Sequence, residues 1–193
     1  MPHDGMVLRG YACLFDEIID AEHGPEMLCK TALNSSLCSP NRKVEFWLNH
    51  EETLNVGSTD DCLTLYLDRH GLAFQLEFPD TPLGEEARSR AGRINGASIG
   101  FKYQRTHEEV IDGKPVLIID ALNLNEISLV YNPDCKSAFA LLYKPDRPLS
   151  EDCESGCLLS QAKWLAFKRL SNEVSLKISC LGSLAFFEAQ DNQ

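Results

Sequence analysis

The sequence predicts a strand-rich α+β domain whose strands are mostly antiparallel, and three observations support this. Short runs of alternating apolar and polar residues recur along the first three quarters of the chain. Turn residues separate two of these runs at hairpin spacing, with Gly71 at the turn. Residues Leu83–Arg90 have a helical composition that ends at Gly92.

The individual strands follow from the same alternation. The segment Glu17–Pro40 is expected to be irregular, because Gly24-Pro25 and Ser39-Pro40 interrupt it. Residues 122–130 are apolar on both faces, which is typical of a central strand. The predicted strands are Met6–Phe15, Lys43–His50, Leu63–Leu67, Leu72–Phe78, Ser98–Thr106, Pro115–Ala121, Leu122–Val130 and Ser137–Tyr143.

The composition changes after Pro145 and Pro148, so we divide the chain into residues 1–145 and 146–193. The second region begins with the acidic stretch Ser150–Gly156, which resembles a linker. Apolar residues then recur at helical spacing from Leu158, which predicts an amphipathic helix followed by a tail.

The charge balance excludes some classes of partner. A net charge of −11 argues against direct binding of nucleic acid, which needs clustered lysine and arginine. No apolar run reaches the length of a membrane span, and the first residues lack the pattern of a signal peptide. We therefore expect a protein of the reducing cytoplasm.

The eight cysteines are scattered, and only Cys153 and Cys157 lie close together. No second pair or nearby histidine completes a zinc-binding set. We expect free thiols, no metal site and no cofactor.

Ser98 lies between small residues in the sequence Gly96-Ala97-Ser98-Ile99-Gly100. A glycine-rich turn capped by a serine is the structural alternative to a nucleophile. The nucleophile elbow of α/β-hydrolases has a strand before this motif and a helix after it. Here the order is reversed, so that fold is rejected.

His50 and Glu126 are the candidate partners of Ser98. His50 is in phase with Val44, Phe46 and Leu48, so we expect it on the core side at a strand end, as a general base or as a histidine bonded to the backbone. Glu126 is in phase with Leu122 and Leu124. A carboxylate there needs a partner, which could be the His50 ring or an arginine.

His107 is an alternative third member, because some proteases use a second histidine. It lies in the polar stretch Thr106-His107-Glu108-Glu109, which is typical of a solvated hairpin end.

An ordered set of short motifs runs from about residue 8 to residue 141. The motifs are Arg9-Gly10-Tyr11-Ala12 with Phe15, Trp47-Leu48-Asn49-His50, Gly57, Gly71-Leu72 with Phe74, Phe78-Pro79-Asp80-Thr81, Gly96-Ala97-Ser98-Ile99-Gly100-Phe101, and Glu126-Ile127-Ser128-Leu129-Val130 with Asn132-Pro133. No single motif is decisive, whereas the ordered set is specific. In this set the chain resembles the prohead maturation proteases of tailed bacteriophages.

The resemblance implies a serine endopeptidase with a β-rich, barrel-like core and surrounding helices, similar to herpesvirus assembly proteases. It implies His50 as general base, Ser98 as nucleophile and Glu126 as third member, whereas herpesvirus enzymes use a histidine there. It implies action inside the procapsid, in the host bacterial cytoplasm. The implied partners are the scaffold part of the major capsid protein, the portal and other procapsid components, and the chain itself through self-cleavage; self-association is left open.

Two other functions compete with this one. A catalytically inactive capsid-assembly scaffold or chaperone-like protein could keep the same fold, but it would have no reason to retain all three candidate residues. An esterase or amidase is disfavoured by the context of the Gly-x-Ser-x-Gly sequence.

Overall fold

The computed structural model describes residues 5–39 and 42–144. The predicted linker and helix after residue 145 lie outside these residues. The described residues form ten strands and two helices, in the order β1 (Val7–Leu14), β2 (Ile18–Ala21), β3 (Gly24–Leu28), α1 (Asn34–Leu37), β4 (Glu45–Leu48), β5 (Glu51–Ser58), β6 (Leu63–Leu67), β7 (Gly71–Glu77), α2 (Pro82–Ala91), β8 (Gly96–Ile111), β9 (Lys114–Val130) and β10 (Phe139–Tyr143).

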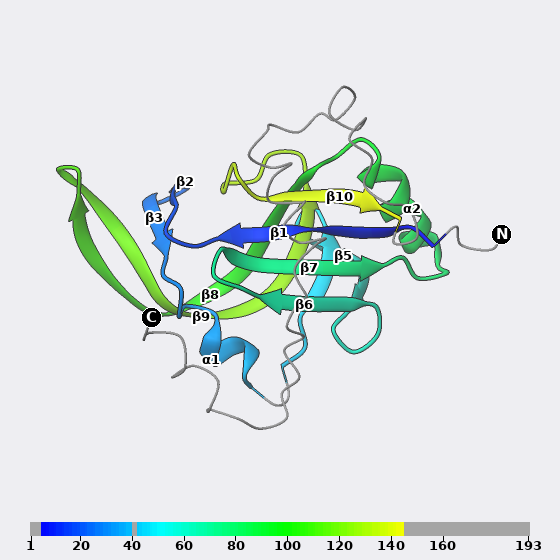
Figure 1. The fold of residues 1–193 in the computed structure, drawn as a ribbon, viewed down its shortest axis with the longest axis horizontal. Helices are drawn as coiled ribbons and strands as arrows, with labels where there is room; N and C mark the ends of the chain where they lie inside the picture. The colour runs from blue at the N-terminus through cyan, green and yellow to red at the C-terminus, as the bar shows by residue number, and fades with distance from the viewer. Residues whose placement is uncertain (1–4, 40–41, 145–193) are drawn as a thin grey trace, which may run out of the picture.

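The first sheet is antiparallel and has the strand order β10-β1-β7-β6 in the described part of the chain (Figure 1). The hairpin predicted between β6 and β7 is confirmed. Asp68 Oδ1 accepts hydrogen bonds from the amides of His70 and Gly71, at 2.7 and 3.1 Å. This side chain closes the turn that joins the two strands.

The second sheet is mixed and is built around β9. Strands β3 and β4 pair with one edge of β9 in parallel, and β8 pairs with its other edge in antiparallel orientation. The expectation that Leu122–Val130 is central is therefore confirmed, although it forms one continuous strand with residues 114–121.

The fold prediction needs three corrections. The described strands form two open sheets rather than a barrel-like core, although most strand pairs are antiparallel as predicted and only the pairs of β3 and β4 with β9 are parallel. Only two short helices are present in residues 5–39 and 42–144, so the strands are not surrounded by helices there. The segment expected to be irregular contains the β2–β3 hairpin, because Gly24-Pro25 lies at the start of β3, before its pairing with β9 begins at Glu26, where proline is tolerated.

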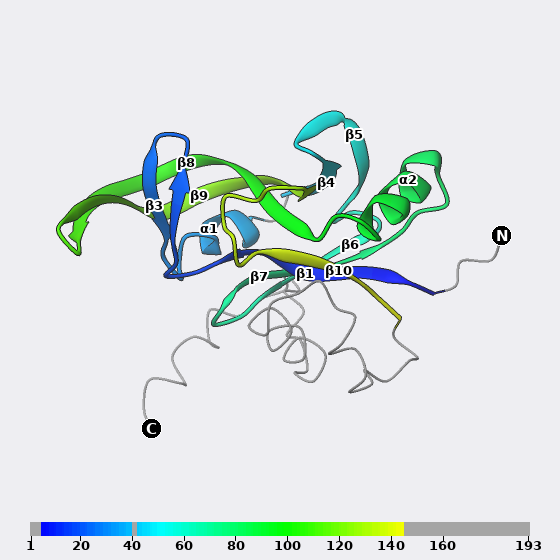
Figure 2. The ribbon, with the colours of Figure 1, turned by 90° about the horizontal axis from the view of Figure 1, so that it is seen from above.

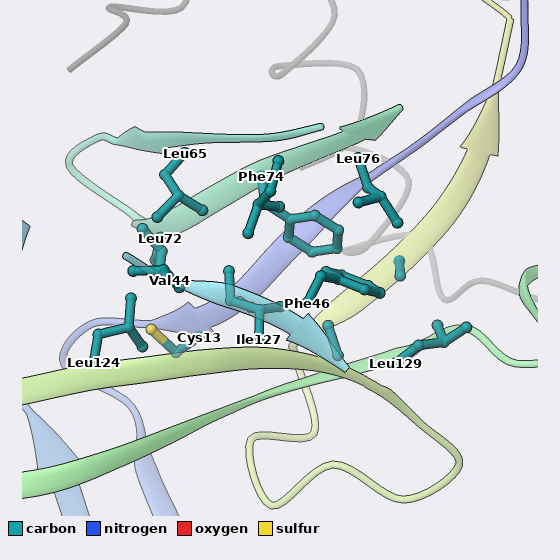
Figure 3. Close-up of a cluster of buried hydrophobic side chains, with 14 of the residues drawn as sticks. Cys13, Val44, Phe46, Leu65, Leu72, Phe74, Leu76, Leu124, Ile127 and Leu129 are labelled. Carbon is teal, nitrogen blue, oxygen red and sulfur yellow. The ribbon is translucent and has the colours of Figure 1, made fainter. Parts of the chain in front are cut away.

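The core lies between the two sheets. Figure 3 shows side chains of β4 and β9 meeting those of β6 and β7. Phe46 of β4 and Phe74 of β7 are fully buried, with ring centroids 5.7 Å apart. Ile127 and Leu129 of β9 lie in the same cluster. This packing fixes β4 and β9 in place, and both strands lead to the site described below.

The two helices are short and local. In α2, the Thr81 side chain caps the N-terminus by accepting a hydrogen bond from the Gly84 amide at 3.1 Å. In α1, the buried Ser36 hydroxyl accepts a hydrogen bond from the Leu124 amide of β9 at 2.9 Å. Past the residues where β9 pairs with β3, β8 and β9 continue as a two-stranded arm, residues 109–116 (Figures 1 and 2).

Candidate active site

His50 lies in the two-residue turn between β4 and β5. Leu48 pairs with Glu51 across this turn, and Asn49 and His50 both have positive φ, at 56° and 60°. These are the features of a type I′ hairpin turn, and asparagine and histidine are among the residues that tolerate such φ values best. The expectation that His50 faces the core is wrong, because the strand alternation ends at Leu48 and the His50 side chain is 44% exposed.

Ser98 lies on the face of β8 that points away from the core. Its neighbours Ala97 and Ile99 pack against the core, so Ser98 takes the opposite face. Ser98 pairs with Ser128 of β9 and is partly exposed. Its hydroxyl has no hydrogen-bond partner within the described residues.

A β-bulge at Asn125 brings Glu126 to the same face. The register passes from Phe101 paired with Leu124 to Gly100 paired with Glu126, which leaves Asn125 as an extra residue in β9. The Arg42 guanidinium donates to the Leu124 carbonyl and to Asn125 Oδ1, and so holds the bulge. The expectation that Glu126 shares a face with Leu122 and Leu124 is wrong, because the bulge reverses the alternation.

The carboxylate of Glu126 connects two groups. Its Oε1 is 2.6 Å from Nδ1 of His50, and its Oε2 accepts a hydrogen bond from the Ser128 hydroxyl at 2.7 Å. The Glu126 side chain is only 3% exposed. A buried carboxylate is costly without partners, and here both oxygens have one.

The contact with Glu126 sets the electrostatics of His50. The hydrogen bond to Glu126 raises the pKa of His50 above its ordinary value, while partial burial opposes this and the charges of Glu126 and Asp134 add to it. A carboxylate can only accept, so Nδ1 carries the proton and Nε2 of neutral His50 has a free lone pair. This is the tautomer that a general base requires.

The structure thus brings His50 and Glu126 into direct contact and places Ser98 on the adjoining strand. Ser98 is connected to this pair through strand pairing, because it lies opposite Ser128, whose hydroxyl contacts Glu126. In the described part of the chain no hydrogen bond joins Ser98 directly to His50.

His107 lies opposite Ile118 of β9, nine residues along β8 from Ser98, which is about 30 Å at the usual rise of a strand. Its ring nitrogens contact Asp120 at 2.7 Å and Glu109 at 3.0 Å. The structure does not bring it to Ser98.

Ser128 is the site residue whose role the sequence reasoning did not consider. It is fully buried, and its hydroxyl contacts both Glu126 and the His50 amide. A signal was present, because residues i and i+2 of a strand share a face and Glu126 and Ser128 are both polar in an apolar strand.

In residues 5–39 and 42–144, no group of three or more potential metal-binding side chains occurs. The five cysteines there are free thiols, and burial raises the pKa of Cys13 to about 12. Cys153 and Cys157 lie outside these residues. No described helix is long and apolar enough to span a membrane.

Comparison with protein families gives a match to the caudovirus prohead serine proteases over residues 2–142. The chain belongs to this family. The match covers His50, Ser98 and Glu126, and it confirms the resemblance found over about residues 8–141. Members of the caudovirus prohead serine protease family act in capsid maturation, so the chain is assigned at family level to that process. No curated protein matches the chain.

Proposed function

We propose that this chain is a serine endopeptidase that cleaves the scaffold part of the major capsid protein, and then itself, inside the procapsid in the host cytoplasm. The observation that carries the proposal is the 2.6 Å contact between His50 Nδ1 and the buried Glu126 carboxylate, beside the strand that bears Ser98. Membership of the prohead serine protease family supports the same substrate class.

In this proposal the three residues have separate roles. The Ser98 oxygen bonds to the scissile carbonyl carbon while His50 Nε2 takes the hydroxyl proton. The C–N bond then breaks, and the proton passes from His50 to the leaving amine. His50 Nε2 then takes a proton from a water molecule whose oxygen attacks the acyl ester. The ester bond to Ser98 breaks, the new carboxyl group leaves, and the proton returns from His50 to the Ser98 oxygen. Glu126 holds the His50 ring and stabilises its protonated form throughout.

The position of Ser98 on β8 fits an extended peptide substrate. In the described residues β8 pairs with β9 alone, so its other edge has unpaired backbone groups. A polypeptide segment can add to such an edge as another strand, with main-chain hydrogen bonds holding it beside Ser98. A small ester or amide could not use these bonds, which favours protein cleavage over esterase chemistry.

The test is co-expression with the major capsid protein of the same phage, followed by mass measurement of both chains. We expect a shortened capsid protein and a shortened protease with the wild-type chain. Ser98→Ala should prevent both cleavages, because loss of a triad serine costs about 10⁶ in turnover. Intact chains with the wild-type protein would instead indicate an inactive assembly factor, and cleavage at the wild-type rate by folded Ser98→Ala would refute Ser98 as nucleophile.

A further inference from the structure

The side chain of Ser128 makes two hydrogen bonds that link two of the candidate catalytic residues. Its hydroxyl donates to Glu126 Oε2 at 2.7 Å and accepts from the backbone amide of His50 at 3.0 Å. The residue has no exposed surface. Water therefore cannot take over either bond if the hydroxyl is removed.

The amide that Ser128 accepts from belongs to a strained turn. Asn49 and His50 both have positive φ, a conformation that costs energy for residues other than glycine and persists only where neighbouring groups hold it. Two hydrogen bonds from the backbone of this turn reach β9, namely Asn49 N–H to the Leu129 carbonyl at 3.0 Å and His50 N–H to the Ser128 hydroxyl. Ser128 thus anchors the backbone from which the His50 ring projects.

The hydrogen bond from the Ser128 hydroxyl to Glu126 orients the carboxylate of the Glu126–His50 pair. With only Oε1 engaged, the carboxylate could rotate about its last side-chain torsion, which is soft. The Ser128 hydroxyl engages Oε2, so the plane of the carboxylate is set and Oε1 is held toward His50 Nδ1. One hydroxyl therefore orients both the acid and the turn that carries the base.

We propose that Ser128 is a positioning residue of the site, which sets the geometry of the Glu126–His50 pair without contacting the substrate. This inference rests on the proposed function of the three residues. A misplacement of about 1 Å in such a pair is enough to lower turnover by about 10²-fold.

The test compares Ser128→Ala and Ser128→Thr in the full-length chain, on a peptide spanning the mapped cleavage site. We expect Ser128→Ala to lower kcat by about 10²-fold with KM nearly unchanged, since the substrate does not contact Ser128. Ser128→Thr keeps the hydroxyl and should restore most of kcat. Ser58→Ala is the matched control, because Ser58 is 2% exposed and also has hydrogen-bonded neighbours, Asp60 and Asp61.

A second measurement is independent of activity. In ¹⁵N-labelled protein, the Nδ1 proton of His50 should exchange slowly with solvent in the wild-type chain and in Ser58→Ala, and at least tenfold faster in Ser128→Ala. If the wild-type chain cleaves nothing, the proposed function fails, and this exchange rate still decides the role of Ser128.

Three results would overturn the proposal. The first is a kcat within twofold of wild type in Ser128→Ala. The second is an equal loss of kcat in Ser58→Ala, when its thermal stability matches that of Ser128→Ala. The third is an exchange rate of the His50 Nδ1 proton that does not change in Ser128→Ala. Should Ser128→Ala be insoluble, Ser128→Cys replaces it, because a thiol fills the same space but is a weak donor. Wild-type kcat in Ser128→Cys would contradict the proposal equally.

Discussion

Gly100 lies directly opposite Glu126 across the β8–β9 pair, and the Glu126 carboxylate occupies the space that a side chain at Gly100 would need. A Cβ there would lie 2.1 Å from Glu126 Oε1 and 2.9 Å from its carboxyl carbon. The second glycine of Gly-x-Ser-x-Gly therefore makes room for the acid that contacts His50. This explains the sequence without a nucleophile elbow.

Gly100→Ala should lower cleavage by about 10²-fold while the chain stays folded. The methyl group can be accommodated only if the end of the Glu126 side chain moves, and that movement breaks its contact with His50. Peptide cleavage and thermal unfolding measure the two effects. Gly92→Ala is the matched control, because Gly92 has φ −71° and a Cβ there meets only the Ser89 carbonyl at 3.7 Å. Equal activity in the two variants would contradict the role assigned to Gly100.

Glu126→Gln should change both the rate and its pH dependence. The hydrogen bond to Glu126 is the main reason that the pKa of His50 lies above 6.5. His50 must be neutral to accept a proton, so kcat/KM rises with pH through this pKa. The neutral amide stabilises the protonated ring less, so the pKa falls and the acid limb moves to lower pH. The maximal rate should fall by about 10⁴-fold, as expected for loss of an orienting carboxylate.

Single-turnover rates measured from pH 5 to 9 would give both quantities. An acid limb that stays in place, or moves to higher pH, in a folded Glu126→Gln variant would show that another group controls the titration of His50. Asp134 is the charged residue to examine next, because it also raises the pKa of His50.

His107→Ala should leave cleavage within about twofold of wild type. His107 is exposed and is bound to Asp120 and Glu109, far along β8 from Ser98. Surface substitutions of this kind usually change stability little. The same peptide assay measures the cleavage rate of His107→Ala, with His50→Ala as the comparison variant. A large loss in His107→Ala, with a small one in Glu126→Gln, would assign the third role to His107.

Features that depend on neighbouring residues could be predicted from the sequence, whereas features that depend on residues far apart in the chain could not. The β6–β7 turn depends on residues 68–71 alone, and the α2 cap depends on Thr81 and its neighbours, so both regions could be predicted. The bulge at Asn125 depends on pairing with β8 and on Arg42, more than 80 positions away. Strand alternation therefore named Glu126 as a candidate but gave the wrong face for it.

The parallel pairing of β4 with β9 is another non-local feature, and it decides where His50 lies. Trp47 pairs with Ser128 and Leu48 with Leu129, which brings the turn after β4 to the end of β9. The alternation of residues 43–50 continues through His50 in the sequence, so it could not show that the strand ends at Leu48. The positive φ of Asn49 and His50 marks that end, and only the backbone reveals it.

Truncation after Pro148 should give a soluble chain that still cleaves but is not packaged into procapsids. The last described strand, β10, ends at Tyr143, and the family match ends at residue 142, so the truncated chain keeps both sheets and the site. The apolar positions that recur from Leu158 at helical spacing need a partner surface. We expect that surface on the capsid scaffold, because a protease that acts inside the procapsid needs an element that docks there.

The measurement is the protease content of purified procapsids by mass spectrometry, with Ser98→Ala in both the truncated and the full-length chain so that cleavage does not remove either one. Full-length protein in the particles and truncated protein outside them is the expected result. Equal packaging of both would contradict a docking role for residues 149–193. An insoluble truncated chain would show instead that the region stabilises the protease domain, since its apolar positions would then be needed to cover the core.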